Sequence, residues 1–204
     1  MATGSRTRLD PAARRAQLVE LGLEMLSTRS LDDLAIEDIA VAAGISRGLL
    51  FHYFPSKHDY REAVVRAAAA DLLAHLAPDL DVPLSERLRA GIVAYVDYVS
   101  DNRDSYVSLL RGASGGDPGL RQVFDETRSA IAANLLDQIT QLGNAEPPAR
   151  VRLVIRGWVA FGEEVVLDWL SDPGSDLDRP VIADLLEQSL LTLVATAAAA
   201  GGER

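Results

Sequence analysis

The sequence contains no cysteine, which excludes disulfide bonds, thiolate metal ligands and cysteine nucleophiles. A chain without cysteine is compatible with a reducing compartment. The first ten residues, MATGSRTRLD, lack the apolar stretch of a signal peptide. No uncharged apolar run reaches the roughly 18 residues that a membrane span needs. We therefore expect a cytoplasmic protein that does not enter a membrane.

The chain is also poor in lysine and in the alternating pattern of β-strands. Lys57 is the only lysine, whereas apolar residues, mostly alanine and leucine, recur at helical spacing almost everywhere. Proline and glycine clusters separate these periodic segments. The sequence therefore predicts an all-α protein with about nine helices. Their expected ranges are 11 to 27 or 28, 36–43, 46–53, 57–77, 84–101, 103–111, 118–142, 148–171 and 180–199.

Charge is distributed unevenly along the chain, whose net charge is −10. Residues 1–61 hold eight basic and eight acidic side chains, and four of the basic ones are arginines within the first fifteen residues. The remaining residues carry twelve basic and twenty-two acidic groups, and therefore all of the net negative charge. A polyanionic partner should thus meet the N-terminal segment and avoid the rest.

The stretch IEDIAVAAGISRGLLFHYF predicts two short helices joined by a tight turn. Gly44 can adopt a positive φ at the turn without a Cβ penalty. Ser46 is a good N-cap for the second helix, and Leu50 and Phe54 share the face that this helix would bury. This is the pattern of a helix-turn-helix unit. A plain helical hairpin with its aromatics in the core is the alternative.

The second helix of this unit leaves a face that can contact nucleic acid. Arginine and histidine donate hydrogen bonds to base edges and phosphates, glycine permits close backbone approach, and aromatic rings pack on sugars or thymine methyl groups. The residues expected on or beside this face are Arg47, Gly48, Leu49, Phe51, His52 and Tyr53.

A longer string, LAIEDIAVAAGISRGLLFHYFPSKHDYREAVV, resembles the N-terminal DNA-binding domain of the TetR family of transcriptional regulators. The resemblance covers about residues 11–62. It implies a three-helix DNA-binding domain at 1–56. Three positions depart from the family pattern: Ala35 replaces a Thr or Ser, Phe51 a frequent Tyr, and Ser30 a glycine. The DNA-contacting residues that the resemblance implies are Ser46, Arg47, Gly48, Leu49, Phe51, His52, Tyr53 and Lys57.

The rest of the chain carries no enzyme signature. GASGGDPG at 112–119 lacks the ending of a phosphate loop and reads as an interhelical linker. Glu163 and Glu164 are neighbours on a helix and diverge by about 100°, so they cannot share one site. His75 has no second ligand at a metal-binding spacing. We expect no catalytic site, no metal and no cofactor.

Six aromatic residues in the later helices fit either a core or a ligand cavity. A cavity lined by tyrosine and tryptophan offers apolar area with a few polar handles, which suits a largely apolar molecule. The resemblance implies that the second domain, 57–204, binds a small effector between its helices. The candidate ligand-binding residues are Tyr95, Tyr98, Tyr106, Phe124, Trp158 and Phe161.

The last two expected helices have long apolar faces, and the resemblance implies that these helices form a homodimer. In the final helix, we expect Leu186 and Leu190 to lie in the dimer contact. The resulting hypothesis is a ligand-responsive transcriptional regulator, foremost a repressor released from a palindromic operator by its effector. The alternative is a helical small-molecule-binding protein or enzyme in which the helix-turn-helix is only structural.

Overall fold

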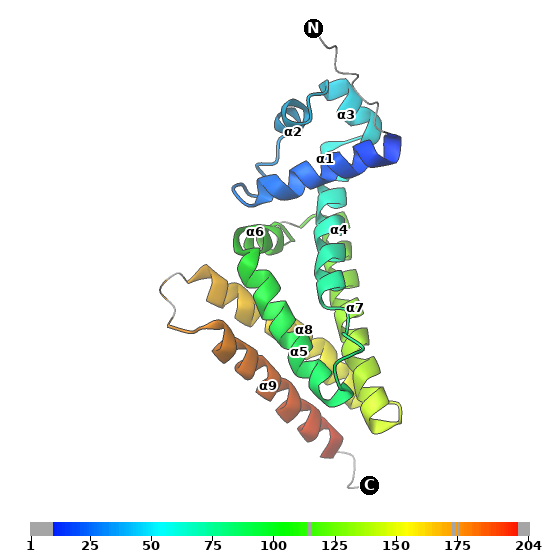
Figure 1. The fold of residues 1–204 in the computed structure, drawn as a ribbon, viewed down its shortest axis with the longest axis vertical. Helices are drawn as coiled ribbons and strands as arrows, with labels where there is room; N and C mark the ends of the chain where they lie inside the picture. The colour runs from blue at the N-terminus through cyan, green and yellow to red at the C-terminus, as the bar shows by residue number, and fades with distance from the viewer. Residues whose placement is uncertain (1–9, 114–115, 173, 175, 200–204) are drawn as a thin grey trace.

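The computed structural model describes residues 10–113, 116–172, 174 and 176–199. The regular secondary structure of these residues consists of nine α-helices (Figure 1), which confirms the predicted all-α class. Each expected helix begins and ends within two residues of the observed one. The helices are α1 (Pro11–Leu26), α2 (Ile36–Ala42), α3 (Arg47–Tyr53), α4 (Lys57–His75), α5 (Leu84–Asp101), α6 (Arg103–Ala113), α7 (Pro118–Gly143), α8 (Ala149–Ser171) and α9 (Arg179–Ala199).

Short polar side chains explain where several helices begin. A carboxylate oxygen of Asp10 accepts a hydrogen bond from the N–H of Ala12 at 2.9 Å, at the start of α1. The hydroxyl oxygen of Ser46 accepts from the N–H of Leu49 at 3.2 Å, at the start of α3. Ser56 caps α4 in the same way. These caps satisfy backbone N–H groups that have no partner inside the helix.

The molecule is elongated, with α1, α2 and α3 gathered at one end (Figure 1). Helix α4 leads from this end into the remaining helices and packs against both α1 and α7. At the other end α9 packs along α5 and α8. Because α4 contacts both groups of helices, a shift of α4 would move one group relative to the other.

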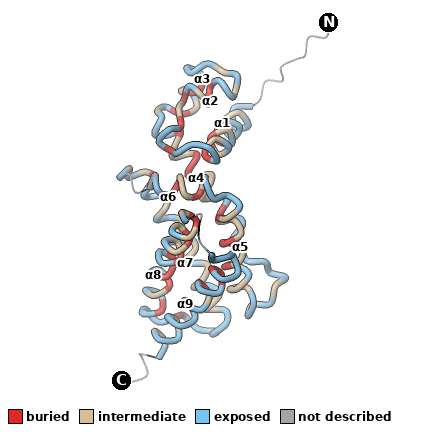
Figure 2. The backbone as a smooth tube through the Cα atoms, turned by 90° about the vertical axis from the view of Figure 1, so that its left-hand side faces the viewer, coloured by how far each residue is buried: buried red, intermediate tan, exposed pale blue. Residues whose placement is uncertain are grey.

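Two apolar cores are buried along this length, and they appear in red in Figure 2. The first core joins α1–α3 to the first part of α4, and it also takes Leu109 from α6 and Leu120 and Val123 from α7. The second core is built from α5 to α9. A boundary after residue 56 falls between α3 and α4, whereas the first core continues onto α4, so the division into 1–56 and 57–204 stays a prediction.

The crossing of α1 and α4 depends on a glycine. A Cβ atom at Gly22 would lie 2.5 Å from the hydroxyl oxygen of Tyr60 and 2.6 Å from Cγ2 of Val64. The Tyr60 hydroxyl is buried and donates a hydrogen bond to the carbonyl oxygen of Leu18 at 2.7 Å. Burial raises the pKa of Tyr60 far above its ordinary value. The absent side chain therefore lets α1 and α4 approach closely enough for Tyr60 to reach the backbone of α1.

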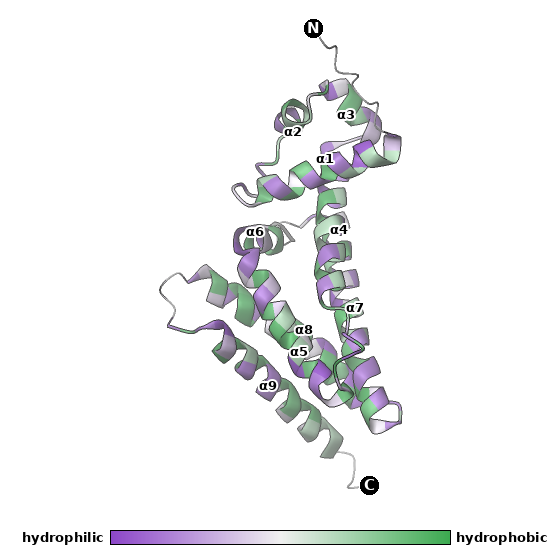
Figure 3. Cartoon of the chain, viewed as in Figure 1, coloured by the Kyte–Doolittle hydropathy of each residue, from purple (hydrophilic) through white to green (hydrophobic). Residues whose placement is uncertain are grey.

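One helix in the described part of the chain, α9, is long and apolar enough to cross a membrane by length and composition. Figure 3 shows its predominantly hydrophobic colouring. Core helices of soluble proteins pass the same test, and α9 packs against α5 and α8. A single helix of this kind is weak support for a membrane span.

Candidate functional site

Helices α2 and α3 form the predicted helix-turn-helix unit. Gly44 adopts a φ of 63° at the turn, in the left-handed region that glycine occupies without strain. The N–H of Ile45 donates to the carbonyl oxygen of Ala40 at 3.0 Å and closes the turn. Leu50 and Phe54 are buried in the first core. Burial of these two residues fixes which face of α3 is left outside.

The outer face of α3 carries most of the predicted DNA-contacting residues. Leu49 is 41% exposed, which leaves apolar surface available to a partner. Phe51 and Tyr53 are half-buried and pack against the first core. The predicted residues that are exposed are Ser46, Arg47, Gly48, Leu49, His52 and Lys57. Their contact with DNA stays a prediction.

Arg47 is held by two neighbours in the DNA-free protein. Its Nη1 lies 2.7 Å from Oε1 of Glu37 in α2, and its guanidinium lies 5.4 Å from the ring centroid of Phe51. The side chain of Arg47 remains 64% exposed. Sequence reasoning missed Glu37, because a pairing between two helices depends on how they cross. Glu37 is a built-in competitor for any anion that Arg47 binds.

Lys57 lies at the start of α4, beside Arg61 and the turn that precedes α2. Its Nζ donates to the carbonyl oxygen of Asp32 at 3.4 Å. Arg61 also donates to this oxygen, and its Nη1 lies 3.3 Å from Oδ1 of Asp32. Lys57 therefore has a weak backbone partner in the free protein and remains available for a phosphate. Ala35 is the N-cap residue of α2 and makes no side-chain hydrogen bond there.

The second candidate site is a cavity of about 700 Å³ between the two groups of helices. Its lining comes from α1 and from each of the helices α4, α5, α6, α7, α8 and α9. Most of the lining is apolar, contributed by residues such as Leu72, Ile92 and Leu135. The predicted ligand-binding residues that line it are Tyr95, Tyr98, Tyr106, Phe124 and Trp158. This volume is typical of a small-molecule site.

The placement of Phe161 in this cavity was wrong. Its side chain is 42% exposed and lies on the outer face of α8, while the adjacent Gly162 and Glu163 line the cavity. Successive helix positions differ by about 100°, so one residue is enough to change the face. Glu164 is exposed, and Glu163 and Glu164 therefore do diverge as the sequence predicts.

A polar cluster lies in the cavity wall. The hydroxyl oxygens of Tyr95 and Tyr106 are 2.6 Å apart. Nε of Arg128 donates to Oε2 of Glu163 at 2.6 Å. Burial raises the pKa of Tyr95 and of Tyr106, so both phenols are neutral at physiological pH. Burial also raises the pKa of Glu163, against the opposing effect of Arg128. Sequence reasoning missed Arg128, which is the positive partner of Glu163.

Two further polar positions lie away from this cluster. The Tyr98 hydroxyl donates to Oδ2 of Asp71 at 2.8 Å, and burial together with this carboxylate raises the pKa of Tyr98. On α7, the Gln138 Nε2 donates to Oδ1 of Asn134 at 2.8 Å. The other amide atom of Gln138, Oε1, is buried without a hydrogen-bond partner in the described part of the chain. Sequence reasoning did not identify Gln138.

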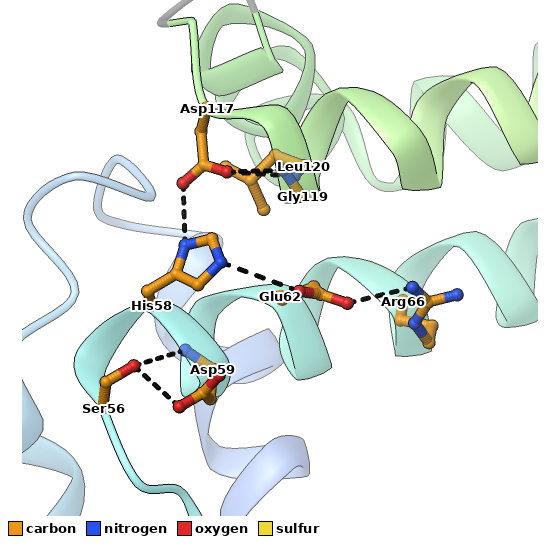
Figure 4. A network of polar contacts seen from close by, with 8 residues as sticks. All are labelled: Ser56, His58, Asp59, Glu62, Arg66, Asp117, Gly119 and Leu120. Atoms are coloured by element: carbon orange, nitrogen blue, oxygen red, sulfur yellow. Dashed lines mark hydrogen bonds and ion pairs between the residues drawn. The ribbon is translucent and has the colours of Figure 1, made fainter.

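His58 connects α4 to the start of α7 (Figure 4). Its Nδ1 lies 2.8 Å from Oδ2 of Asp117, and its Nε2 lies 3.7 Å from Oε2 of Glu62. Glu62 in turn pairs with Arg66 at 2.9 Å. The predicted linker at 112–119 thus supplies a structural residue, Asp117. Residues 114 and 115 of this linker lie outside the described residues, as do Arg6 and Arg8 of the basic N-terminus.

Asp117 is also the N-cap of α7. Its Oδ1 accepts hydrogen bonds from the N–H groups of Gly119 at 2.9 Å and Leu120 at 3.2 Å. Partial burial acts to raise the pKa of Asp117, but these two bonds and His58 outweigh it and lower the pKa below its ordinary value. One carboxylate therefore fixes the start of α7 and binds α4. No group of three or more metal-ligating side chains occurs among the described residues.

The expectation that Leu186 and Leu190 form the dimer contact is wrong. Leu186 and Leu190 are each 1% exposed because they pack inside the second core of their own subunit. They cannot also contact a partner. The exposed apolar residues of the two helices are Leu153 and Phe161 in α8 and Val181, Leu185, Leu191 and Leu193 in α9. Leu193 is seven residues from Leu186 and shares its side of α9, so the other five residues are the candidate dimer surface.

Comparisons with known proteins match two parts of the chain to sequence models of one family. Residues 18–64 match the sequence model of bacterial regulatory proteins of the tetR family. Residues 84–194, more than half of the chain, match that of the tetracyclin repressor-like C-terminal domain. The first range includes the helix-turn-helix unit, and the second includes most of the cavity lining.

Individual relatives agree with these matches over nearly the whole chain. A crystal structure of a tetR-family transcriptional regulator from Streptomyces coelicolor is 34% identical, covers 96% of this chain and 86% of that chain, and superposes with a TM-score of 0.82. The HTH-type transcriptional repressor KstR2 of Mycolicibacterium smegmatis is 29% identical over 92% of each chain. The HTH-type transcriptional activator FasR of the same species is 25% identical over 87% of this chain and 79% of its own length. The protein therefore belongs to the TetR family of transcriptional regulators, which are ligand-responsive DNA-binding proteins.

Proposed function

We propose that the protein represses transcription by binding a palindromic operator as a homodimer, and that a small molecule in the cavity releases it. The observation that carries this proposal is that α4 lines the cavity and directly follows α3 in the chain. The exposed face of α3 is the proposed DNA-contacting surface. A ligand that shifts α4 would therefore displace α3. This arrangement couples a small-molecule site to a nucleic-acid surface.

The DNA-contacting surface is the outer face of α3 with Lys57 beside it. The major groove admits an α-helix, and an arginine there can donate two hydrogen bonds to O6 and N7 of guanine. Arg47 is the side chain placed to do this, on the first turn of α3. His52 lies on the same outer side, and Lys57 would bind a phosphate. The acidic remainder of the chain would face away from the DNA.

The dimer surface is the exposed apolar set on α8 and α9. Leu153, Phe161 and Leu185 expose large apolar side chains on two helices that pack against each other, which is typical of an interface. A two-fold axis through this surface would present two copies of α3 to successive major grooves, about 34–36 Å apart. A palindromic operator is the expected match to that symmetry.

Release by the effector would be a shift in population between two arrangements of α4. The His58–Asp117 contact ties α4 to α7, and both helices line the cavity. A ligand that separates the two helices would work against this contact and move α3 from its register on DNA. The relatives include a repressor and an activator. A ligand that separates α4 from α7 would release the DNA, and release of DNA by a ligand is the behaviour of a repressor. DNA as the partner also favours a cytoplasmic location.

The experiment passes sheared genomic DNA of the source organism over the immobilised full-length protein and sequences what is retained as salt rises. We expect a few fragments that share a two-fold-symmetric sequence, and we expect a small-molecule extract of the same cells to elute them. Retention that depends only on fragment length would contradict the proposal. The rival, a helical binding protein or enzyme, predicts no retention and DNA-independent turnover of a bound metabolite.

A further inference from the structure

Two polar features of the cavity wall, the Tyr95–Tyr106 pair and Gln138, indicate what a ligand must offer. The two hydroxyls of Tyr95 and Tyr106 form one hydrogen bond with each other, at 2.6 Å. Each phenol carries one proton, so this contact uses one O–H and leaves the other without an acceptor in the pair. Neither phenol ionises near neutral pH. The tyrosine pair therefore offers one donor to an oxygen atom of a ligand.

The second polar feature is the side-chain amide of Gln138. Of the buried side-chain nitrogen and oxygen atoms in the described part of the chain, two lack a hydrogen-bond partner, and Gln138 Oε1 is the one whose residue lines the cavity. A buried acceptor left in this way is destabilising, because it has given up its hydrogen bonds to water without gaining another. A hydroxyl or N–H group of a ligand would satisfy it. The Nε2 of the same amide is occupied by Asn134.

These two positions lie at different levels of the cavity. The tyrosine pair lies toward the start of α7, since Tyr106 comes from α6, whose Leu109 shares the first core with Val123 of α7. Arg128 lines the cavity from the same half of α7. It precedes Gln138 by ten residues on α7, and a helix rises about 1.5 Å per residue, so the two levels are about 15 Å apart. The wall between them is apolar, with Ile131 and Leu135 on α7.

The charges of the lining disfavour an anionic ligand. Four acidic residues, Glu20, Glu24, Asp71 and Glu163, line the cavity with two arginines, Arg87 and Arg128. Both arginines are already partnered: Arg128 by Glu163, and Arg87 by the carbonyl oxygens of Val82 and Leu80 at 2.9 Å and 3.0 Å. A carboxylate or phosphate in the cavity would therefore find no free cation and a net negative wall.

We propose that the cavity takes an uncharged, elongated, largely apolar molecule with an acceptor oxygen at the Tyr95–Tyr106 end and a hydroxyl or N–H donor at the Gln138 end. This inference rests on the proposed function in taking the cavity as the effector site. It adds the charge, the length and the polarity of the two ends. A ligand of this class satisfies both unpaired groups and leaves the existing ion pairs intact.

The test uses straight-chain probes of about twelve carbons, a length that spans the two levels with C–C bonds of about 1.5 Å. The first probe is a hydroxyketone, with the ketone near one end of the chain and the hydroxyl at the other. The others replace the hydroxyl by a methyl group or a carboxylate, or replace the ketone by a methylene group. Affinity for the full-length protein is measured by calorimetry. We expect the hydroxyketone to bind about 2- to 10-fold more tightly than either singly functional neutral probe, and the carboxylate to bind more weakly than all of them.

Three variants assign these preferences to residues. Gln138→Leu should abolish the preference for the hydroxyl end and keep the preference for the ketone. The double change Tyr95→Phe with Tyr106→Phe should do the reverse, because either phenol alone still has a proton to donate. Gln141→Leu is the matched control, since Gln141 is exposed three residues later on α7, outside the cavity lining, where it donates to Asp137, and the change should leave both preferences unchanged.

Tighter binding of the carboxylate than of the hydroxyketone would overturn the inference, and so would a hydroxyl preference that survives Gln138→Leu. Failure of every neutral probe to bind a protein that still binds its operator would also overturn it. A hydroxyketone that binds with the expected preferences and leaves operator affinity unchanged would support the inference and contradict the proposed function.

Discussion

The hydroxyl oxygen of Ser108 in α6 accepts a hydrogen bond from the backbone N–H of Leu31 at 3.0 Å, in the turn between α1 and α2. The same hydroxyl donates to the carbonyl oxygen of Arg29 at 3.4 Å. Tyr106, two residues earlier in α6, lines the cavity, and Leu109, one residue later, belongs to the first core. Helix α6 therefore connects the cavity wall directly to the turn that leads into the helix-turn-helix unit.

Changing Ser108→Ala should weaken the contact between α6 and the turn that precedes α2. The N–H of Leu31 would lose its side-chain acceptor, which we expect to lower the free energy of unfolding by about 1–3 kcal/mol. The matched control is Ser100→Ala, whose hydroxyl donates only to the carbonyl oxygen of Val96 in its own helix. Urea unfolding of the two variants measures the difference. Equal losses would mean that the Ser108 contact adds nothing beyond a local helix bond.

Changing Leu185→Glu should dissociate the dimer without unfolding the subunit, because Leu185 is 46% exposed on α9. In a two-fold interface the two introduced carboxylates lie close together and repel each other. Changing Leu186→Glu should instead unfold the protein, since it places a charge in the second core. Sedimentation velocity with circular dichroism separates the two results. A Leu185→Glu protein that stays dimeric at low concentration would exclude this part of α9 from the interface.

These two leucines also show how far the sequence could lead. Helical spacing predicted α9, and its apolar content predicted an interface. Residues 185, 186 and 190 are all leucines, however, so residue type does not tell which of them faces the subunit core. That assignment depends on how α9 packs against α5 and α8.

The helix-turn-helix was more predictable because its signals are local. A cap at Ser46, a glycine at the turn and two buried residues on α3 fix which side of that helix is exposed. The Arg47–Glu37 pair and the unpaired oxygen of Gln138 could not be predicted, because both depend on contacts between helices. The cavity residues lay between these cases: five of the six predicted aromatics line it, and Phe161 misses it by one helix position.

Changing Glu37→Gln should strengthen binding to every DNA sequence. The carboxylate competes with phosphates and bases for Arg47, and an exposed ion pair of this kind contributes about 0.2–1 kcal/mol, so affinity should rise roughly 1.4- to 5-fold. Glu164→Gln makes the same change in net charge on the exposed side of α8 and is the control. Fluorescence anisotropy at low salt measures both. Equal gains would show that net charge, rather than release of Arg47, is responsible.

Alkaline pH should destabilise the protein through its buried phenols. The pKa values of Tyr60, Tyr95, Tyr98 and Tyr106 are all raised, chiefly by burial. Their contribution is fully present below the unfolded pKa of about 10, and it is lost as pH rises toward the folded values, because the unfolded chain then releases protons that the folded chain retains. In a spectrophotometric titration these four phenols should ionise only as the protein unfolds. Ionisation near pH 10 with the helical signal intact would contradict their burial.

The most direct test of the proposed function is selection from a pool of randomised DNA duplexes, at two salt concentrations, with the wild-type protein and the Arg47→Ala and Lys57→Ala variants. The proposed function predicts that the wild type selects a two-fold-symmetric sequence. Arg47→Ala should lose about 1–3 kcal/mol and relax one base position in each half-site. Lys57→Ala should keep the selected sequence, weaken binding to all duplexes alike and reduce the salt slope by about one per subunit. A wild-type protein that enriches no sequence, or an Arg47→Ala variant that selects an unchanged motif with the same loss as Lys57→Ala, would contradict the assignment of α3 as the reader of the operator.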